Sequence, residues 1–107
     1  MRIGIVGLGV VGEANKVGFT SLGHQVAIHD IKIPYSDLGK VVNSDIVFIC
    51  VPTPSNEKGE CDTTIVESVI HELHERNHNG IIAIRSSTVP GFTESMISRY
   101  KNNKICF

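Results

Sequence analysis

A short glycine-rich turn near the start of the chain constrains the fold more than any other feature of the sequence. The apolar run RIGIV at residues 2–6 leads directly into GLGVVG at residues 7–12, and a helical pattern follows at once. A strand that turns on glycine into a helix is the opening of a βαβ unit, which needs a parallel partner strand further along the chain. The sequence therefore predicts an α/β fold.

The rest of the chain alternates between strand-like and helix-like segments. Strands are predicted at residues 2–6, 25–29, 45–51, 81–85 and 104–107. Helices are predicted after Gly9 as far as Leu22, at 63–77 and at 92–101, with about two turns of helix inside 31–44. This alternation predicts a doubly wound, Rossmann-like parallel sheet of about five strands in the order 2-1-3-4-5, with helices on both faces. Ligands bind such sheets beyond the carboxyl ends of the strands, where strands 1 and 3 diverge.

The apolar residues of the predicted helices indicate which side of each helix faces the sheet. The first helix repeats apolar residues at Val10, Ala14 and Val17. The helix at 63–77 carries an apolar stripe made of Ile65, Val66, Val69, Ile70 and Leu73, and the helix at 92–101 is expected to bury Phe92, Met96 and Ile97. Asp62 is predicted to cap the helix at 63–77, with Thr64 and Glu67 as a capping box.

Length and composition exclude several classes of protein. With 107 residues, the chain is expected to form a single domain, residues 1–107. Its net charge of -1 gives no reason to expect a nucleic acid or a membrane surface as partner, and no apolar run approaches the roughly 20 residues that span a bilayer. Cys50, Cys61 and Cys106 lack the spacing of a zinc site or a disulfide framework, which favours a reducing cytoplasm. Cys50 and Cys106 are expected to be buried in strands.

The glycine turn has the chemistry of a dinucleotide-binding site. Gly7 permits a tight turn, Gly9 lets the backbone approach a pyrophosphate, and Gly12 lets the helix pack closely on the strands. The backbone N–H groups of Val10 and Val11, at the positive end of the helix, are predicted to bind the phosphates. The alternative is a structural turn without a ligand.

Asp30 follows the second predicted strand at the position where such folds carry an acidic residue. A carboxylate there accepts hydrogen bonds from the ribose hydroxyls of adenosine and repels a 2′-phosphate, so NAD is predicted in preference to NADP. A solvated aspartate at a strand end is the alternative, and the neighbours His29 and Lys32 would soften the preference.

Three further segments resemble segments of the UDP-glucose/GDP-mannose dehydrogenase family. Residues 44–54 read SDIVFICVPTP, residues 59–62 read GECD, and residues 86–91 read SSTVPG. Together with GLGVVG, they extend the resemblance along nearly the whole chain.

The resemblance implies roles for the turns that follow the third and fourth predicted strands. Val51, Pro52 and Thr53 would lie along the cofactor, and Ser87 and Thr88 beside it. In the family, the threonine matched by Thr88 reaches the reaction centre and helps to hold the water used in thioester hydrolysis, so Thr88 is expected to support catalysis. Each turn has the alternative of a purely structural role.

The resemblance also implies a function. Members of the family oxidise the C6 hydroxyl of a nucleotide sugar to a carboxylate in two NAD-dependent steps, using cysteine, lysine and glutamate residues beyond the segment matched here. We therefore expect the NAD-binding domain of a nucleotide-sugar 6-dehydrogenase, without the catalytic and nucleotide-sugar-binding domains and not competent alone. A partner chain or self-association would complete the active site, with Cys106 and Phe107 at an apolar sheet edge.

Two other functions remain open. The first is a stand-alone NAD(H)-binding module or sensor without turnover, which the missing catalytic residues favour. The second is another hydroxyacid-type dehydrogenase, against which the VPTP and STVP turns weigh. A metal site is not predicted. His71, His74 and His78 share a helical stripe, but their polar neighbours make a solvated helix face the better explanation.

Overall fold

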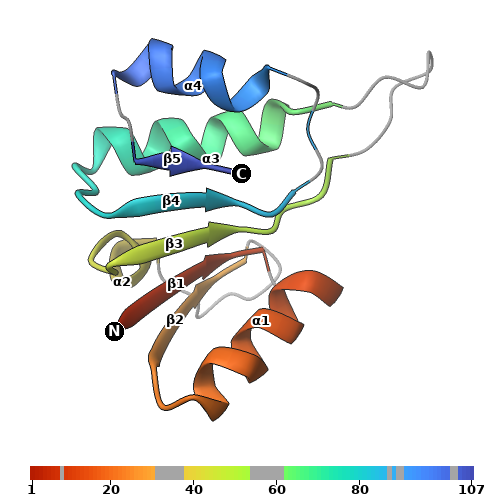
Figure 1. Cartoon of the computed structure of the whole chain (residues 1–107), viewed down its shortest axis with the longest axis vertical. Coiled ribbons are helices and arrows are strands. Elements are labelled where there is room, and N and C mark those ends of the chain that lie inside the picture. The colour runs from red at the N-terminus through yellow and green to blue at the C-terminus, as the bar shows by residue number, and fades with distance from the viewer. Residues whose placement is uncertain (8, 31–37, 54–61, 87, 89–90, 102–103) are drawn as a thin grey trace.

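Five parallel strands form a single sheet. The computed structural model of the chain describes residues 1–7, 9–30, 38–53, 62–86, 88, 91–101 and 104–107. Within them the strand order is β2-β1-β3-β4-β5, which confirms the predicted order (Figure 1). The strands are β1 (Arg2–Val6), β2 (Gln25–His29), β3 (Ile46–Ile49), β4 (Ile81–Ile84) and β5 (Ile105–Cys106). The chain goes from β1 to β2 on one side and then to β3 on the other, so the direction of winding reverses at β1.

Helices cover both faces of the sheet, as predicted. They are α1 (Val10–Ser21), α2 (Leu38–Val42), α3 (Thr64–Glu75) and α4 (Phe92–Tyr100). Side chains of α2, α3 and α4 share one hydrophobic core with residues of β1, β3, β4 and β5. α1 packs on the opposite face, where the ring of Phe19 lies 5.0 Å from the ring of Phe48, centroid to centroid. Phe48 alternates with the core residues Val47 and Ile49, so its side chain points to the other side of the sheet.

Several elements are shorter than predicted. β3 spans Ile46–Ile49 rather than 45–51, and β5 spans only Ile105–Cys106 rather than 104–107. α2 has 5 residues, fewer than the predicted two turns, and residues 31–37 of that segment lie outside the described part of the chain. Val51 follows the end of β3 and is buried, but it does not pair with a neighbouring strand. The predicted strand was too long because an apolar run indicates burial and not strand pairing.

The apolar side of α3 agrees with its predicted stripe except at one position. Val66, Ile70 and Leu73 are buried against the sheet. Ile65 is instead 41% exposed, because adjacent residues of a helix point in different directions and Val66 takes the inward position. In α4, Phe92 and Met96 are buried as predicted.

The predicted inward side of α1 is wrong. Val17 is 56% exposed and Ala14 is also exposed, so the side of the helix that carries them faces solvent. Gly12, which is buried, and Phe19, which is half-buried, lie two turns apart and face the sheet instead. The orientation of α1 is determined by the close backbone contact at Gly12 and by the aromatic contact between Phe19 and Phe48. The spacing of the valines does not determine it.

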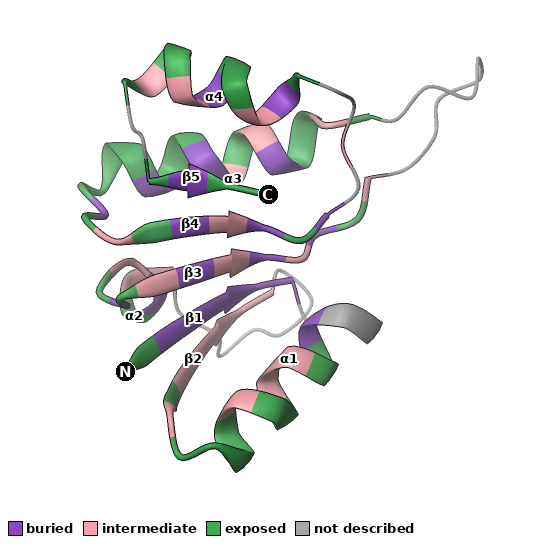
Figure 2. Ribbon diagram, in the orientation of Figure 1, coloured by how far each residue is buried: buried purple, intermediate pink, exposed green. Residues whose placement is uncertain are grey.

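The face of the sheet that carries α1 is less completely covered than the other. α1 contacts β1 and β2, and β4 and β5 lie beyond it (Figure 2). On that face Ile81 is 42% exposed and Cys106, expected to be buried, is exposed. Phe107, directly after β5, is 74% exposed. Apolar side chains are therefore exposed at the β5 edge, as the sequence led us to expect.

Candidate functional site

The glycine turn after β1 is anchored to the ends of both neighbouring strands. The N–H of Gly7 donates to the carbonyl oxygen of His29, the last residue of β2, at 2.8 Å. On its other side Gly7 lies against the end of β3, since a Cβ at this position would come within 2.8 Å of backbone atoms of Cys50. The φ of Gly7 is +91°, which glycine adopts far more readily than other residues. The turn thus draws together the carboxyl ends of β2, β1 and β3.

The start of α1 is closed on one side and open on the other. A Cβ on Gly12 would collide with the carbonyl oxygen of Gly7, so helix and turn are in direct backbone contact. A Cβ on Gly9 would meet none of the described atoms within 4 Å. Gly9 is the N-cap of α1, its backbone is extended, and no described side chain caps the helix. The first amides of α1 therefore border open space at the positive end of a helix, which suits an anionic ligand.

Asp30, Thr53 and Thr88 follow three different strands at this same edge of the sheet. Asp30 comes directly after β2, Thr53 follows β3, and Thr88 follows β4; all three are half-buried. Because the carboxyl ends of parallel strands meet at one edge, the structure brings these residues to the edge that holds the glycine turn. We call this set of strand ends the carboxyl edge.

The other predicted cofactor-binding residues differ in their burial. Val51 is buried in the core, and Pro52 is exposed. Val10 and Val11 are described for their backbone, which forms the first turn of α1, but not for their side chains. Ser87 lies outside the described residues.

One residue that the sequence analysis does not predict joins the ends of β3 and β4. Ser86 is 6% exposed, and its hydroxyl donates to the carbonyl oxygen of Val51 at 2.7 Å. A sequence signal for it exists, since Ser86 continues, two residues past the end of β4, the alternation of Ile82 and Ile84, which both face the core. The family resemblance instead predicted roles for the next two residues, Ser87 and Thr88.

The thiol at the end of β3 does not have the properties of a nucleophile. Burial raises the pKa of the Cys50 thiol above its ordinary value, and the positive charge of Arg85 offsets this only in part. A raised pKa keeps the thiol protonated at neutral pH, whereas a nucleophile needs the thiolate. Cys50 follows β3 beside the glycine turn and is half-buried, so the expectation that it is buried in a strand is wrong. Cys61 lies outside the described residues.

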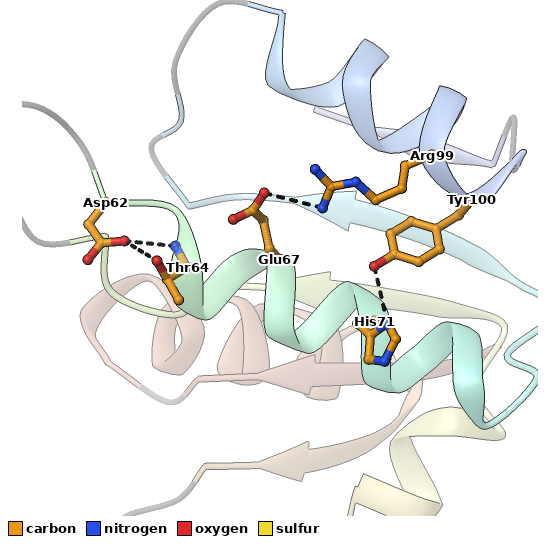
Figure 3. Close-up of polar contacts among 6 residues, drawn as sticks. All are labelled: Asp62, Thr64, Glu67, His71, Arg99 and Tyr100. Carbon is orange, nitrogen blue, oxygen red and sulfur yellow. Dashed lines mark hydrogen bonds and ion pairs between the residues drawn. The ribbon is translucent and has the colours of Figure 1, made fainter.

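The three histidines do not share a surface. His71 and His74 are exposed on α3, and the Tyr100 hydroxyl lies 3.3 Å from Nδ1 of His71 (Figure 3). His78 follows the end of α3, is 8% exposed, and donates from Nδ1 to the carbonyl oxygen of Val42 at 2.8 Å. The predicted solvated face is thus confirmed for His71 and His74 and wrong for His78. Among the described residues no group of three or more histidine, cysteine, aspartate or glutamate side chains is placed to hold a metal ion.

The N-cap of α3 is Thr63 rather than the predicted Asp62, and its side chain makes no capping hydrogen bond. Asp62, one residue earlier, contacts the first helical residue instead, and no capping box forms. Its Oδ1 accepts from the hydroxyl of Thr64 and, at 2.9 Å, from the N–H of Thr64 (Figure 3). The hydroxyl bond, followed by the N–H bond, lowers the pKa of the Asp62 carboxyl below its ordinary value. The carboxylate of Glu67 lies 3.4 Å from Arg99 of α4 instead of returning to the helix start, so the predicted pairing with Thr64 is wrong.

A separate hollow lies at the amino ends of the strands. Its volume is about 310 Å³, and its lining includes Arg2, Asn43, Asp45, Asn77 and Asn79. Ligands of doubly wound sheets bind at the opposite ends of the strands, so this hollow is not the candidate site. No helix in the described part of the chain has both the length and the apolar character needed to cross a membrane.

Comparison with known proteins matches residues 35–105 to the NAD-binding domain of the UDP-glucose/GDP-mannose dehydrogenase family. GDP-mannose 6-dehydrogenase from Pseudomonas aeruginosa is 33% identical over 61 residues, and UDP-glucose 6-dehydrogenase from Rickettsia felis is 30% identical over 92 residues. These alignments cover 53% and 86% of this chain but only 14% and 17% of the two relatives.

The likeness extends to three dimensions. A crystal structure of GDP-mannose dehydrogenase from Pseudomonas aeruginosa matches this chain with a TM-score of 0.76 at 25% identity. The match covers 98% of this chain and 34% of that protein. Nearly all of this chain is therefore similar to one part of a much longer protein.

Proposed function

This chain belongs to the UDP-glucose/GDP-mannose dehydrogenase family and matches the NAD-binding domain of that family, and we propose how its residues hold the cofactor. The observation that carries the proposal is the open space at Gly9 beside the closed contacts of Gly7 and Gly12. The pyrophosphate would lie over Gly9 and accept hydrogen bonds from the N–H groups of Val10 and Val11. When bound, oxidised NAD accepts a hydride, and the residues of this chain bind and orient it.

Asp30 would bind the ribose of the adenosine half. The residue before it, His29, accepts a hydrogen bond from the N–H of Gly7 through its carbonyl oxygen. Asp30 is therefore one residue away from a direct hydrogen bond to the glycine turn. A carboxylate accepts hydrogen bonds from both ribose hydroxyls and repels a 2′-phosphate. This supports a preference for NAD over NADP.

The turns after β3 and β4 would hold the nicotinamide half. With the pyrophosphate over Gly9 and the adenosine at Asp30, the rest of the cofactor must extend toward the β3 side of the sheet. We assign this half to Val51, Pro52 and Thr53 after β3 and to Ser87 and Thr88 after β4. The family resemblance further suggests that the Thr88 hydroxyl supports catalysis by holding water.

The cofactor preference can be measured directly. Titration with NADH and NADPH is expected to give one-to-one binding that favours NADH by about tenfold or more, since ionic repulsion of the 2′-phosphate corresponds to at least about 1.4 kcal/mol. Asp30→Asn keeps the size of the side chain but removes its charge, and should weaken NADH binding and narrow the NADH/NADPH ratio. Equal affinities of the wild type for both cofactors would rule out the assignment of Asp30.

We propose that this domain serves a nucleotide-sugar 6-dehydrogenase and that the 107-residue chain alone turns over no substrate. The raised pKa of Cys50 supports this, because the thiol beside the glycine turn is protonated at neutral pH. Incubated with oxidised NAD and either UDP-glucose or GDP-mannose, the purified chain is expected to form no NADH above the background rate. Sustained NADH formation that requires the sugar nucleotide would contradict the proposal.

A second candidate function is a stand-alone module that senses or sequesters NAD(H) without turnover. The protonated thiol of Cys50 is compatible with it as well. The two functions differ in their need for another protein. A dehydrogenase component would gain turnover when the remaining length of a nucleotide-sugar 6-dehydrogenase is supplied on a second chain, whereas a sensor would bind NADH tightly and gain none.

We further propose that another chain, or a second copy of this one, covers the β5 edge, in the cytoplasm. The exposed Phe107, directly after the edge strand β5, supports the contact, since exposed apolar side chains at a sheet edge favour association. The cysteines Cys50 and Cys106 are free, which suits a reducing compartment. A strictly monomeric mass in sedimentation at high concentration would rule out the second copy and leave the separate partner.

A further inference from the structure

The short segment Cys50–Val51 after β3 contacts both the glycine turn and the strand β1. The Cys50–Val51 peptide lies against the glycine turn, because a Cβ on Gly7 would stand 2.8 Å from the carbon and oxygen of Cys50 and 2.8 Å from the nitrogen of Val51. The N–H of Cys50 donates to the carbonyl oxygen of Val6 in β1 at 2.8 Å. The glycine turn and β1 therefore hold this segment on one side, independently of its contacts with β4.

Ser86 holds the same segment from the side of β4. Its Oγ lies 2.7 Å from the carbonyl oxygen of Val51 and 3.3 Å from that of Ile49. A hydroxyl has one proton to donate, so the shorter contact to Val51 is the principal hydrogen bond. The carbonyl oxygen of Ile49 already accepts the N–H groups of Arg85 at 2.8 Å and Ser86 at 3.1 Å. The serine hydroxyl is thus the link that extends the pairing of β3 and β4 beyond the end of the ladder.

We infer that Ser86 is a positioning residue that sets the turn after β3, and with it the nicotinamide half of the cofactor, against the turn after β4. The inference rests on the proposed function. Ser86 is 6% exposed, so it acts through Val51 rather than by touching the cofactor. On the β3 side the hydrogen bond orders the segment Val51–Pro52–Thr53, and on the β4 side Ser86 directly precedes Ser87 and Thr88. The adenosine side of the carboxyl edge, at Asp30, belongs to β2 and does not depend on this bond.

The chain offers a matched control for removal of the hydroxyl. Ser44 is likewise 6% exposed, and its Oγ also donates to a backbone carbonyl oxygen, that of Lys40, at 3.4 Å. It precedes β3 at the amino ends of the strands, the edge opposite to the proposed site. Ser86→Ala and Ser44→Ala therefore make the same chemical change at comparable burial, and only one of them lies at the carboxyl edge.

The test compares NADH with ADP-ribose, which lacks the nicotinamide. Ser86→Ala is expected to weaken NADH binding roughly tenfold, as loss of a buried hydrogen bond would, while ADP-ribose affinity changes less than about twofold. Ser86→Thr keeps the hydroxyl and should recover most of the NADH affinity. Ser44→Ala should leave both affinities unchanged.

Each contrary result has a distinct meaning. Equal NADH affinity of Ser86→Ala and the wild type, or equal losses for NADH and ADP-ribose, would overturn the positioning role while leaving the proposed function intact. Failure of the wild type to bind NADH would overturn both. If Ser86→Ala does not fold, Ser86→Thr and Ser86→Cys provide the test. The positioning role requires Ser86→Thr, which keeps a hydroxyl donor, to bind NADH more tightly than Ser86→Cys, whose thiol is a weaker donor; equal affinities would overturn it.

Discussion

Replacing Gly9 with aspartate is expected to abolish NADH binding without lowering the melting temperature. A side chain at Gly9 meets none of the described atoms within 4 Å, and the residue is the N-cap of α1 with an extended backbone. Aspartate is at least as good an N-cap as glycine, and its charge suits the positive end of a helix. The same carboxylate would occupy the proposed pyrophosphate position and repel it. We expect the NADH dissociation constant to rise by about a hundredfold or more, equivalent to about 3 kcal/mol.

Gly18→Asp is the matched control. Gly18 belongs to the same helix, is exposed, and would also meet no described atom within 4 Å, but it lies far from the first turn. The control adds the same group and the same charge, so its NADH affinity should stay within about twofold of the wild type. Titration calorimetry and thermal unfolding measure the two properties separately. If Gly9→Asp binds NADH normally, the pyrophosphate does not lie at this turn; if it fails to fold, the space at Gly9 is needed by the fold itself.

The sheet could be predicted from the sequence because its signals are local. β1 (Arg2–Val6) and β2 (Gln25–His29) have the predicted bounds, since each apolar run ends at a glycine or a polar residue. The strand order followed from the alternation of strands and helices, which leaves few topologies. β5 is shorter than its apolar run, because a strand needs a paired neighbour and only Ile105 and Cys106 pair with β4.

The orientation of α1 could not be predicted from hydrophobic periodicity. Such a pattern counts apolar side chains, and it selected Val17, which is exposed. The helix is oriented by a residue with no side chain, since Gly12 allows backbone contact with Gly7, and by the contact between Phe19 and Phe48. Hydrophobic periodicity within the helix cannot predict either contact, because Gly7 and Phe48 both lie outside α1.

The same distinction separates the predicted and the unpredicted parts of the site. The glycine turn could be recognised because strand, turn and helix are consecutive in the chain. Ser86 was not recognised, because its partner Val51 is 35 residues away in the sequence. His78 is similar: its hydrogen bond to Val42 spans 36 residues, and the helical spacing of the histidines wrongly indicated an exposed side chain. Contacts between distant segments depend on the assembled sheet.

Replacing Gly12 with alanine is expected to destabilise the domain even though alanine is the better helix former. The gain in helix propensity is about 1 kcal/mol. Against it, the new Cβ would collide with the carbonyl oxygen of Gly7, a backbone atom that cannot rotate away as a flexible side chain can. Overpacking of this kind costs about 1–3 kcal/mol or more, and we place the cost at the upper end, which leaves a net loss of about 2 kcal/mol. For a domain of this size, the melting temperature would fall by roughly 10 °C.

Gly18→Ala makes the same substitution in the same helix without the collision. A Cβ at Gly18 would meet none of the described atoms within 4 Å, so only the propensity term remains, and we expect a gain of up to about 1 kcal/mol. The two variants should therefore change stability in opposite directions, as measured by chemical denaturation. NADH affinity should fall only for Gly12→Ala, because only there does α1 move relative to the turn. If Gly12→Ala raises stability as Gly18→Ala does, the helix retreats from Gly7 at little cost, and close packing at this glycine does not hold the proposed pyrophosphate site in place.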